Sequence, residues 1–361
     1  METYRVEIKE DSDKSYGITI GSAIIEDFAK KFKEKNISNS YVIVADSKIE
    51  KLYGAMLLKS LKENKLNAHI ISFPFGEKNK SRKTKEVIED KMLGLNLKRD
   101  SCILALGGGV VGDVAGFVAS TYMRGIPHIQ IPTTLLSMAD SSIGGKTAVN
   151  TPQAKNAIGS FHQPKEVIID IDFLKSLPKE ELKNGIAEII KHALIMDANF
   201  FYFLEKNMEK IFALDAKILQ DTIKKSCEIK ASVVVQDEKE KGVRKFLNYG
   251  HTIGHAIESA SNYEISHGNA ISIGMACAAK ISVSKGFLKE GDAIRQNNLL
   301  EHAELLHRIS HHHLKPGKIL EHLVYDKKIK DGRLNFVLLK CIGDAFVSDS
   351  ISTEDIKKVL Q

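Results

Sequence analysis

Apolar runs alternate with helical segments along the first half of the chain, and this alternation constrains the fold more than any other feature. Buried strands are predicted at residues 41–45, 68–73, 102–106, 128–131 and 167–170. Helical periodicity occupies residues 48–64 and 83–93, and a further helix starts at about residue 111. Strand–helix–strand alternation is typical of a parallel sheet with helices on its faces. The first half is therefore predicted to be a Rossmann-like α/β domain.

The hydrophobic pattern changes after Leu177 and Pro178. From about residue 179 to residue 279 the apolar side chains recur every three or four positions, which is the period of an α-helix. We therefore expect two domains, an α/β domain at residues 1–177 and a mainly α-helical domain at residues 178–361. A length of 361 residues suits about two domains of ordinary size.

Composition excludes several classes of protein. Hydrophobic residues make up 43% of the chain, too many for a disordered protein. The longest stretch with few charges, residues 101–123, holds five glycines and an acid, a poor composition for a membrane span. The N-terminus has no apolar core of the kind found in signal peptides. The four cysteines are widely spaced and form no CxxC pair, which is typical of reduced, mostly buried thiols. We therefore expect a cytoplasmic protein.

The net charge of +6 does not indicate a nucleic-acid partner. Acids are interleaved with the basic residues, and the basic run at residues 78–83 contains no aromatic side chain on which a base could stack. Solvated surface, or a site for a small anion, fits these charges better.

A glycine-rich turn at residues 107–113 follows one of the predicted strands and opens a helix. It fits the pattern GxGxxG, in which main-chain N–H groups and a helix N-terminus hold a pyrophosphate. The usual fingerprint adds an acid about 20 residues further on for the ribose, but residues 131–134 read Ile-Pro-Thr-Thr. Dinucleotide binding and a simple packing turn both remain open for this motif alone.

A second glycine-rich segment at residues 140–147 ends in Gly-Lys-Thr. Asp140 stands where a Walker A loop needs its first glycine, so this segment is not a Walker A loop. A short glycine loop with a cation and hydroxyls suits a phosphate or another small anion, and Lys155 and Asn156 follow closely. An exposed turn with solvated lysines is the alternative.

Three histidines and one acid indicate a divalent-metal site. His251 and His255 lie one helical turn apart, and His267 follows 16 positions after His251. The best acid is Glu188, because its helical neighbours are apolar and an unpaired carboxylate there would be destabilising. Lys191 shares its helix face. Spacing does not decide between His251 and His255 as ligands.

The run His311, His312 and His313 also looks like a metal tract. Consecutive side chains on a helix or strand point in different directions, so the three imidazoles do not converge easily on one ion. We expect these histidines to be exposed.

Taken together, these residues resemble the 3-dehydroquinate synthases, enzymes of the shikimate pathway. The matching stretches are 107–116, 132–150, 155–163, 185–197, 244–258 and 267–275, in order. The resemblance implies an N-terminal NAD-binding domain, a C-terminal helical metal-binding domain and an active site between them. It also implies a homodimer in which Arg124 reaches the neighbouring subunit's site.

The resemblance further implies the roles of individual residues. The family's metal ligands, for zinc or cobalt, correspond to Glu188, His251 and His267, which leaves His255 to face the substrate. The implied NAD contacts are Asp46, Glu77, Lys80, Gly109, Val110, Val111, Gly112, Asp113, Thr133, Thr134, Lys146, Lys155, Phe173, Leu174, Lys175 and Ser176. The implied substrate contacts are Arg124, Asp140, Lys146, Lys155, Asn156, Lys191, Lys230, Arg244, Asn248, His255, Lys327 and Lys328. Of all these, the expected catalytic residues are Lys191, Asp140, Glu188 and His255. One departure is Phe75, where the family usually has an aspartate.

The implied reaction converts 3-deoxy-D-arabino-heptulosonate 7-phosphate to 3-dehydroquinate and phosphate. Transient oxidation by NAD precedes phosphate elimination, reduction, ring opening and an intramolecular aldol closure, so the enzyme is a lyase. Three alternatives stay open: another sugar phosphate cyclase such as a 2-deoxy-scyllo-inosose synthase, a metal-dependent alcohol dehydrogenase of the glycerol dehydrogenase type, and a non-catalytic anion- or nucleotide-binding protein.

Overall fold

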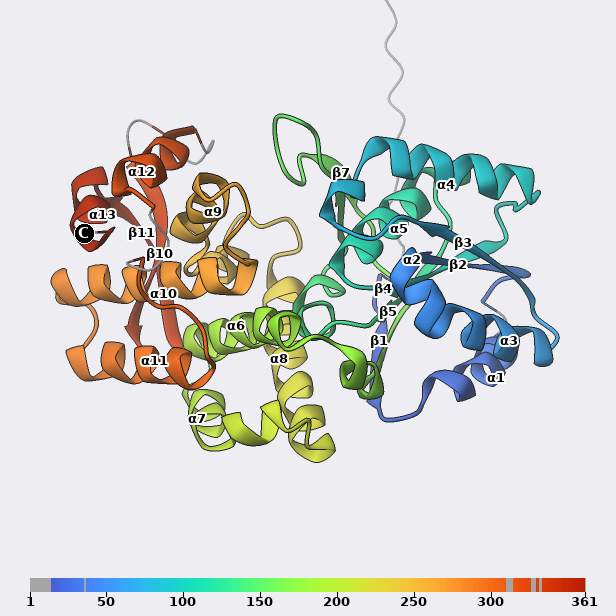
Figure 1. The fold of residues 1–361 in the computed structure, drawn as a ribbon, viewed down its shortest axis with the longest axis horizontal. Coiled ribbons are helices and arrows are strands. Elements are labelled where there is room, and N and C mark those ends of the chain that lie inside the picture. The colour runs from blue at the N-terminus through green and yellow to red at the C-terminus, as the bar shows by residue number, and fades with distance from the viewer. Residues whose placement is uncertain (1–13, 36, 310–313, 326–328, 331–332, 361) are drawn as a thin grey trace, which may run out of the picture.

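The computed structural model describes residues 14–35, 37–309, 314–325, 329–330 and 333–360. Its long axis joins two parts, one built around a parallel sheet and one mainly helical (Figure 1). This arrangement agrees with the fold class predicted from the sequence. The boundary at residues 177 and 178 stays a prediction, and helix α6 (Lys179–Met196) begins just after it.

The first part contains six parallel strands in the order β1-β8-β5-β4-β2-β3. They are β1 (Gly17–Gly21), β2 (Ser40–Asp46), β3 (Asn67–Phe73), β4 (Ser101–Gly107), β5 (His128–Pro132) and β8 (Glu166–Asp170). The side chains of β2 alternate between the two faces of the sheet: Ile43 packs with α1 (Ile25–Lys35) and α3 (Ala55–Glu63), and Val42 packs with α4 (Arg82–Gly94) and α5 (Gly109–Thr121). Both faces are therefore covered, which explains the continuous apolar runs.

The strand order creates a topological switch point between β2 and β4. After β2 the chain moves outward to β3, whereas after β4 it moves the other way to β5 and β8. In open α/β sheets, ligands bind beyond the carboxyl ends of the strands at such a point. Here those ends are Asp46 and Gly107, and the latter begins the glycine-rich turn.

Several short elements were not predicted, among them β1 and α1. The chain also forms an antiparallel hairpin of β6 (Lys146–Val149) and β7 (Ile158–Phe161). The hairpin packs against α5, where a Cβ added to Gly116 would lie 2.5 Å from Thr147 Cγ2. A glycine is needed at that position for this close approach.

The second part is mainly helical, as predicted, but it also contains a three-stranded antiparallel sheet. The strands are β9 (Ile329–Lys330), β10 (Arg333–Cys341) and β11 (Asp344–Ile351). The helices are α6, α7 (Ala198–Phe212), α8 (Ala216–Gln236), α9 (His251–Ala260), α10 (His267–Ser284), α11 (Glu290–His302), α12 (Pro316–Tyr325) and α13 (Thr353–Leu360).

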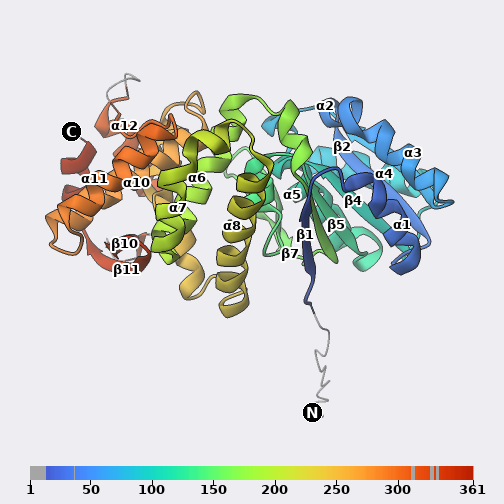
Figure 2. The ribbon, with the colours of Figure 1, turned by 90° about the horizontal axis from the view of Figure 1, so that it is seen from below.

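Helix α6 lies at the junction with the sheet-containing part, beside α8 (Figures 1 and 2). Its residues from Gly185 to Ile195 are all buried. A Cβ added to Gly185 would lie 2.6 Å from Leu135 Cβ, so α6 approaches the chain that follows β5 very closely. The buried residues of this helix are therefore held rigidly between the two parts.

The thiols largely follow the prediction. Cys102, Cys227 and Cys277 are buried, Cys341 is exposed, and all four are free. Within the described ranges, none of the helices is both long enough and apolar enough to cross a membrane.

Candidate active site

The three predicted metal ligands come from three helices and meet at one point. Glu188 lies on α6, and His251 and His267 are the first residues of α9 and α10. The Nε2 atoms of His251 and His267 lie 3.3 and 3.1 Å from Glu188 Oε1. The carboxylate is 1% exposed. The structure therefore assembles a carboxylate and two imidazoles into a compact donor set.

The hydrogen bonds of the two imidazoles suit a cation. His251 Nδ1 lies 3.2 Å from the main-chain carbonyl of Tyr249, and His267 Nδ1 lies 3.4 Å from Glu258 Oε1. An Nδ1–H donated to an oxygen leaves Nε2 with its lone pair, and both lone pairs then point at a carboxylate oxygen. Such a group of electron donors is favourable around a divalent ion. The residues present thus fit zinc or cobalt.

Electrostatics keep the Glu188 carboxylate of this donor set ionised. Burial opposes ionisation of Glu188, but Lys191, which forms an ion pair with it, and His251 hold the pKa of the carboxyl well below its usual range. Burial lowers the pKa of His251. Burial also acts to lower the pKa of His267, but its contacts with Glu188 and Glu258 outweigh this and raise it to about 10.

His255 lies one turn after His251 on α9, and its ring stands edge-on to the His251 ring with centroids 5.1 Å apart. It does not belong to the group of side chains converging on Glu188. The geometry thus separates the two histidines that spacing left equivalent. The substrate-facing role of His255 stays a prediction.

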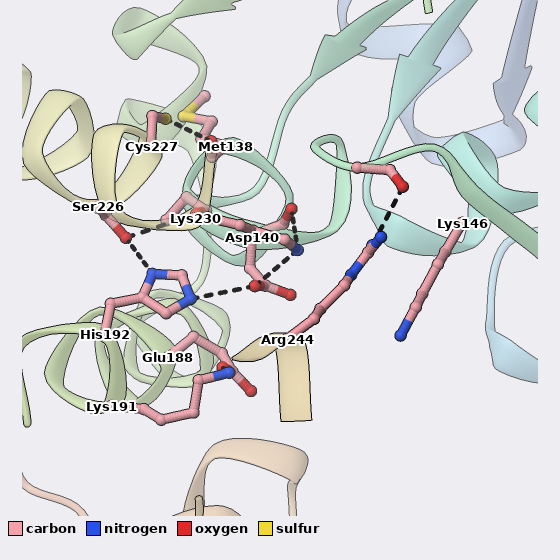
Figure 3. A network of polar contacts seen from close by, with 12 residues as sticks. Met138, Asp140, Lys146, Glu188, Lys191, His192, Ser226, Cys227, Lys230 and Arg244 are labelled. Carbon is pink, nitrogen blue, oxygen red and sulfur yellow. Dashed lines mark hydrogen bonds and ion pairs between the residues drawn. The ribbon is translucent and has the colours of Figure 1, made fainter. Parts of the chain in front are cut away.

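A second cluster surrounds Asp140, which lies in a π-helical turn, Ser137–Ser141. Lys230 Nζ from α8 lies 2.7 Å from Asp140 Oδ1, and His192 Nε2 from α6 lies 3.2 Å from the same oxygen (Figure 3). His192 Nδ1 is 2.7 Å from Ser226 Oγ. Burial acts to raise the pKa of Asp140, but Lys230 and Lys191 hold it well below its usual range. The result is a fixed carboxylate beside the metal ligands.

His192 and Ser226 were not among the predicted site residues. His192 follows Glu188 by four positions and so shares its helix face, which is the signal that was available. Ser226 stands four residues before Lys230 on α8, but nothing local in the sequence pairs it with α6.

A third group contains two predicted cations, Arg244 and Lys146. It also contains an acid, Glu240, which the sequence analysis did not predict. Arg244 is 1% exposed, and its Nη2 donates to the Gly144 carbonyl over 3.0 Å (Figure 3). Lys146 forms an ion pair with Glu240, which also accepts a hydrogen bond of 2.6 Å from Asn248 Nδ2. Three predicted substrate contacts thus lie in or beside the 3-10 segment Val243–Asn248, which precedes α9.

The glycine-rich turn has the geometry of an anion site. Gly108 caps α5 without a side-chain hydrogen bond, so the N–H groups of Gly109, Val110 and Val111 are not used by a cap. A Cβ added to Gly108 would lie 3.1 Å from Thr134 Cγ2, which places Thr134 against the turn.

Lys80 links this turn to the loop after β6. It forms an ion pair with Asp113 of α5, and its Nζ donates to Asn156 Oδ1 over 2.5 Å. Burial raises the pKa of Asp113, and Lys80 opposes this only in part. Glu77 accepts a hydrogen bond of 2.7 Å from Asn150 Nδ2 in the same region.

Asp46 lies at the carboxyl end of β2, on the other side of the switch point. Its Oδ1 accepts the main-chain N–H groups of Lys48 and Ile49 over 2.9 and 3.0 Å. The role of Asp46 as the acid near the ribose stays a prediction.

Other predicted residues lie apart from these clusters. The side chains of Phe173 and Leu174 are buried in the core, so only their main chain can meet a cofactor. Phe75 is 56% exposed and Arg124 is exposed. Of the remaining predicted contacts, Gly112 lies on α5 and Thr133 is buried just after β5. Lys175 and Ser176 lie in the 3-10 segment Ile171–Ser176. Lys327, Lys328 and the run His311 to His313 lie outside the described residues.

Comparison with known proteins places the chain in a family. Residues 70–184 match the family described as 3-dehydroquinate synthase N-terminal, and residues 185–329 match 3-dehydroquinate synthase C-terminal. The curated 3-dehydroquinate synthase of Desulforamulus reducens is 42% identical, with 100% of this chain and 99% of that protein covered. The corresponding protein of Thermodesulfovibrio yellowstonii is 44% identical, also over 100% and 99%.

Solved structures agree with this placement. A 2-deoxy-scyllo-inosose synthase complexed with carbaglucose-6-phosphate, NAD+ and Co2+ has a TM-score of 0.87 and 29% identity, with 95% of each chain covered. A 2-epi-5-epi-valiolone synthase from Streptomyces hygroscopicus with NAD+ and Zn2+ bound has a TM-score of 0.89 and 27% identity, over 99% and 98%. Two family domains and full-length identity above 40% establish that the chain belongs to the 3-dehydroquinate synthase family.

Proposed function

We propose that this chain is a 3-dehydroquinate synthase that uses NAD and a divalent metal, zinc or cobalt. The observation that carries the proposal is identity of 40–44% to curated 3-dehydroquinate synthases over nearly the whole chain. The chain is only 27–29% identical to the solved 2-deoxy-scyllo-inosose synthase and 2-epi-5-epi-valiolone synthase. The substrate is then 3-deoxy-D-arabino-heptulosonate 7-phosphate, and the products are 3-dehydroquinate and phosphate.

The cofactor sites follow from the clusters described above. Glu188, His251 and His267 hold the metal, and the glycine-rich turn with Asp46 across the switch point holds NAD. When bound, the metal acidifies a coordinated hydroxyl group and NAD accepts and later returns a hydride. Because NAD is regenerated in each cycle, the enzyme is a carbon–oxygen lyase and not a net oxidoreductase.

The chain's own residues bind the substrate and move its protons. A sugar acid phosphate carries a carboxylate and a phosphate, and the cations available for them include Lys146, Lys155 and Arg244. Lys191, 2% exposed and paired with Glu188, is suited to hydrogen-bond the reacting hydroxyl. Lys230 and Lys191 keep Asp140 ionised in spite of its burial, so its carboxylate can accept a hydrogen bond from another substrate hydroxyl.

The proposal extends to assembly and location. We expect a cytoplasmic homodimer in which Arg124 serves the neighbouring subunit's site. Arg124 is exposed just after α5, so its side chain is available to a second molecule. Light scattering on the wild type and on Arg124→Ala tests the dimer and, by activity, the role of the arginine.

A product assay tests the function. The purified protein is incubated with the heptulosonate phosphate, catalytic NAD+ and Zn2+, and released phosphate and dehydroquinate are measured. We expect both products in equal amounts without accumulation of NADH. Turnover only of a hexose phosphate that lacks the carboxylate would support another cyclase, and net NADH formation from an alcohol would support a dehydrogenase.

A further inference from the structure

Glu258 reaches from one metal-ligand helix to the other. It lies two turns after His251 on α9, its side chain is 10% exposed, and its Oε1 lies 3.4 Å from His267 Nδ1 on α10. The two helices approach closely, since a Cβ added to Gly254 of α9 would lie 2.7 Å from Ile271 Cδ1 of α10. The contact between Glu258 and His267 is therefore held by rigid backbone on both sides.

The two imidazoles of the metal site differ in what supports them. His251 Nδ1 faces a neutral carbonyl, that of Tyr249, over 3.2 Å, whereas His267 Nδ1 faces a carboxylate. A carboxylate that accepts Nδ1–H fixes the tautomer and the ring orientation and makes the other nitrogen a stronger donor. In His267 that other nitrogen is Nε2, which lies 3.1 Å from Glu188.

Glu258 also contacts the sheet-containing part of the molecule. Its Oε1 lies 3.8 Å from Lys155 Nζ, in the loop between β6 and β7, and the same Nζ stands 3.8 Å above the ring of Tyr263. A single carboxylate thus contacts a metal ligand and a cation proposed to bind the substrate.

We propose that Glu258 is a positioning residue that holds His267 in the tautomer and orientation that bind the metal. The inference rests on the proposed metal site at Glu188, His251 and His267. Glu258 touches neither the metal nor the substrate, and it acts through the imidazole and not through Lys155.

Metal affinity tests the proposal directly. Apo protein is titrated with Zn2+ against a chelating indicator for the wild type, Glu258→Ala, Glu258→Gln and Glu264→Gln. We expect an affinity loss of about 10- to 100-fold for Glu258→Ala. A smaller loss is expected for Glu258→Gln, which keeps a neutral acceptor. Glu264 is an exposed acid just after α9, and its variant should bind like the wild type.

Two further measurements separate positioning from general damage. The Co2+ absorption spectrum of Glu258→Gln should shift relative to the wild type while the melting temperatures of the apo proteins agree. Lys155→Gln should leave Zn2+ affinity within about twofold, because that residue does not act on His267; a loss as large as that of Glu258→Ala would overturn the proposal.

The outcomes also separate this inference from the proposed function. If the wild type binds no metal, the metal site itself is wrong. If the wild type binds Zn2+ and both Glu258 variants bind it equally well, the metal site stands and the role of Glu258 is wrong.

Discussion

Lys230→Met tests how far the fold depends on the charge pair in the Asp140 cluster. Lys230 Nζ lies 2.7 Å from Asp140 Oδ1 and 2.6 Å from the Asp140 carbonyl, and the two side chains are 7% and 21% exposed. Removing one member of a buried ion pair costs about 3–5 kcal/mol, because the other charge is left uncompensated. A fifth of the Asp140 side chain remains in water, so we expect a loss of about 3 kcal/mol in the free energy of unfolding.

A double variant makes this prediction specific. In Lys230→Met with Asp140→Asn no charge is left unpaired, so we expect at least about 2 kcal/mol of the loss to be recovered. We measure this by thermal unfolding of the wild type, both single variants and the double variant. At about 2 °C per kcal/mol, the melting temperature of Lys230→Met should be lower by roughly 6 °C. All three variants should lose turnover. A loss below about 1 kcal/mol for Lys230→Met, or a double variant whose loss equals the sum of the single losses, would refute the reasoning.

Three further predictions concern the metal and pH. His251→Ala should lose bound metal and turnover together, as measured by metal content and phosphate release; full turnover without metal would contradict the assignment. Both ring nitrogens of buried His128 find no hydrogen-bond partner within the described ranges, and burial lowers the pKa of His128 to about 3. When folding lowers the pKa of a histidine, the folded state loses stability as the pH falls below the pKa of the unfolded chain, near 6.5. Between pH 7.5 and 5.5 the free energy of unfolding of the wild type should therefore fall by about 1.4 kcal/mol more than that of His128→Phe. Equal pH slopes in urea unfolding would count against this. Asp355 pairs with Lys285 and with the main chain of Ser352 at the start of α13, which lowers its pKa to about 2. The Asp355 carboxylate stabilises the fold above the pKa of the unfolded chain, near 3.9, and this contribution disappears toward pH 2. Asp355→Asn should therefore be less stable than the wild type by about 1 kcal/mol at pH 7, and the difference between the two should vanish in acid.

Local patterns predicted the elements that are long or fully buried. The strands β2 to β5 and β8 were placed to within about a residue or two, because both faces of the sheet are covered and the runs are apolar throughout. The hairpin β6–β7 has strands of only four residues, and β1 pairs with β8, which is about 150 positions away in sequence. Such elements depend on tertiary pairing, which no local window contains.

In the site, too, some features follow from local sequence and others depend on tertiary packing. Residue types and spacing gathered Glu188, His251, His255 and His267, but which histidines face the acid depends on how α9 and α10 pack beside α6. Similarly, the position of Asp46 relative to the glycine-rich turn follows from the order of strands in the sheet and not from their order in sequence. Glu258 was missed because its partner lies on another helix.

The burial of α6 from Gly185 to Ile195 has a consequence for engineering. Glu188, Lys191 and His192 stand on the segment of this helix that is buried on every side, so nearly any substitution there changes the core and the chemistry at once. Libraries that aim to alter substrate choice should leave this helix untouched. The exposed loop between β6 and β7, which carries Lys155, offers positions where new side chains can be tolerated without disturbing the core.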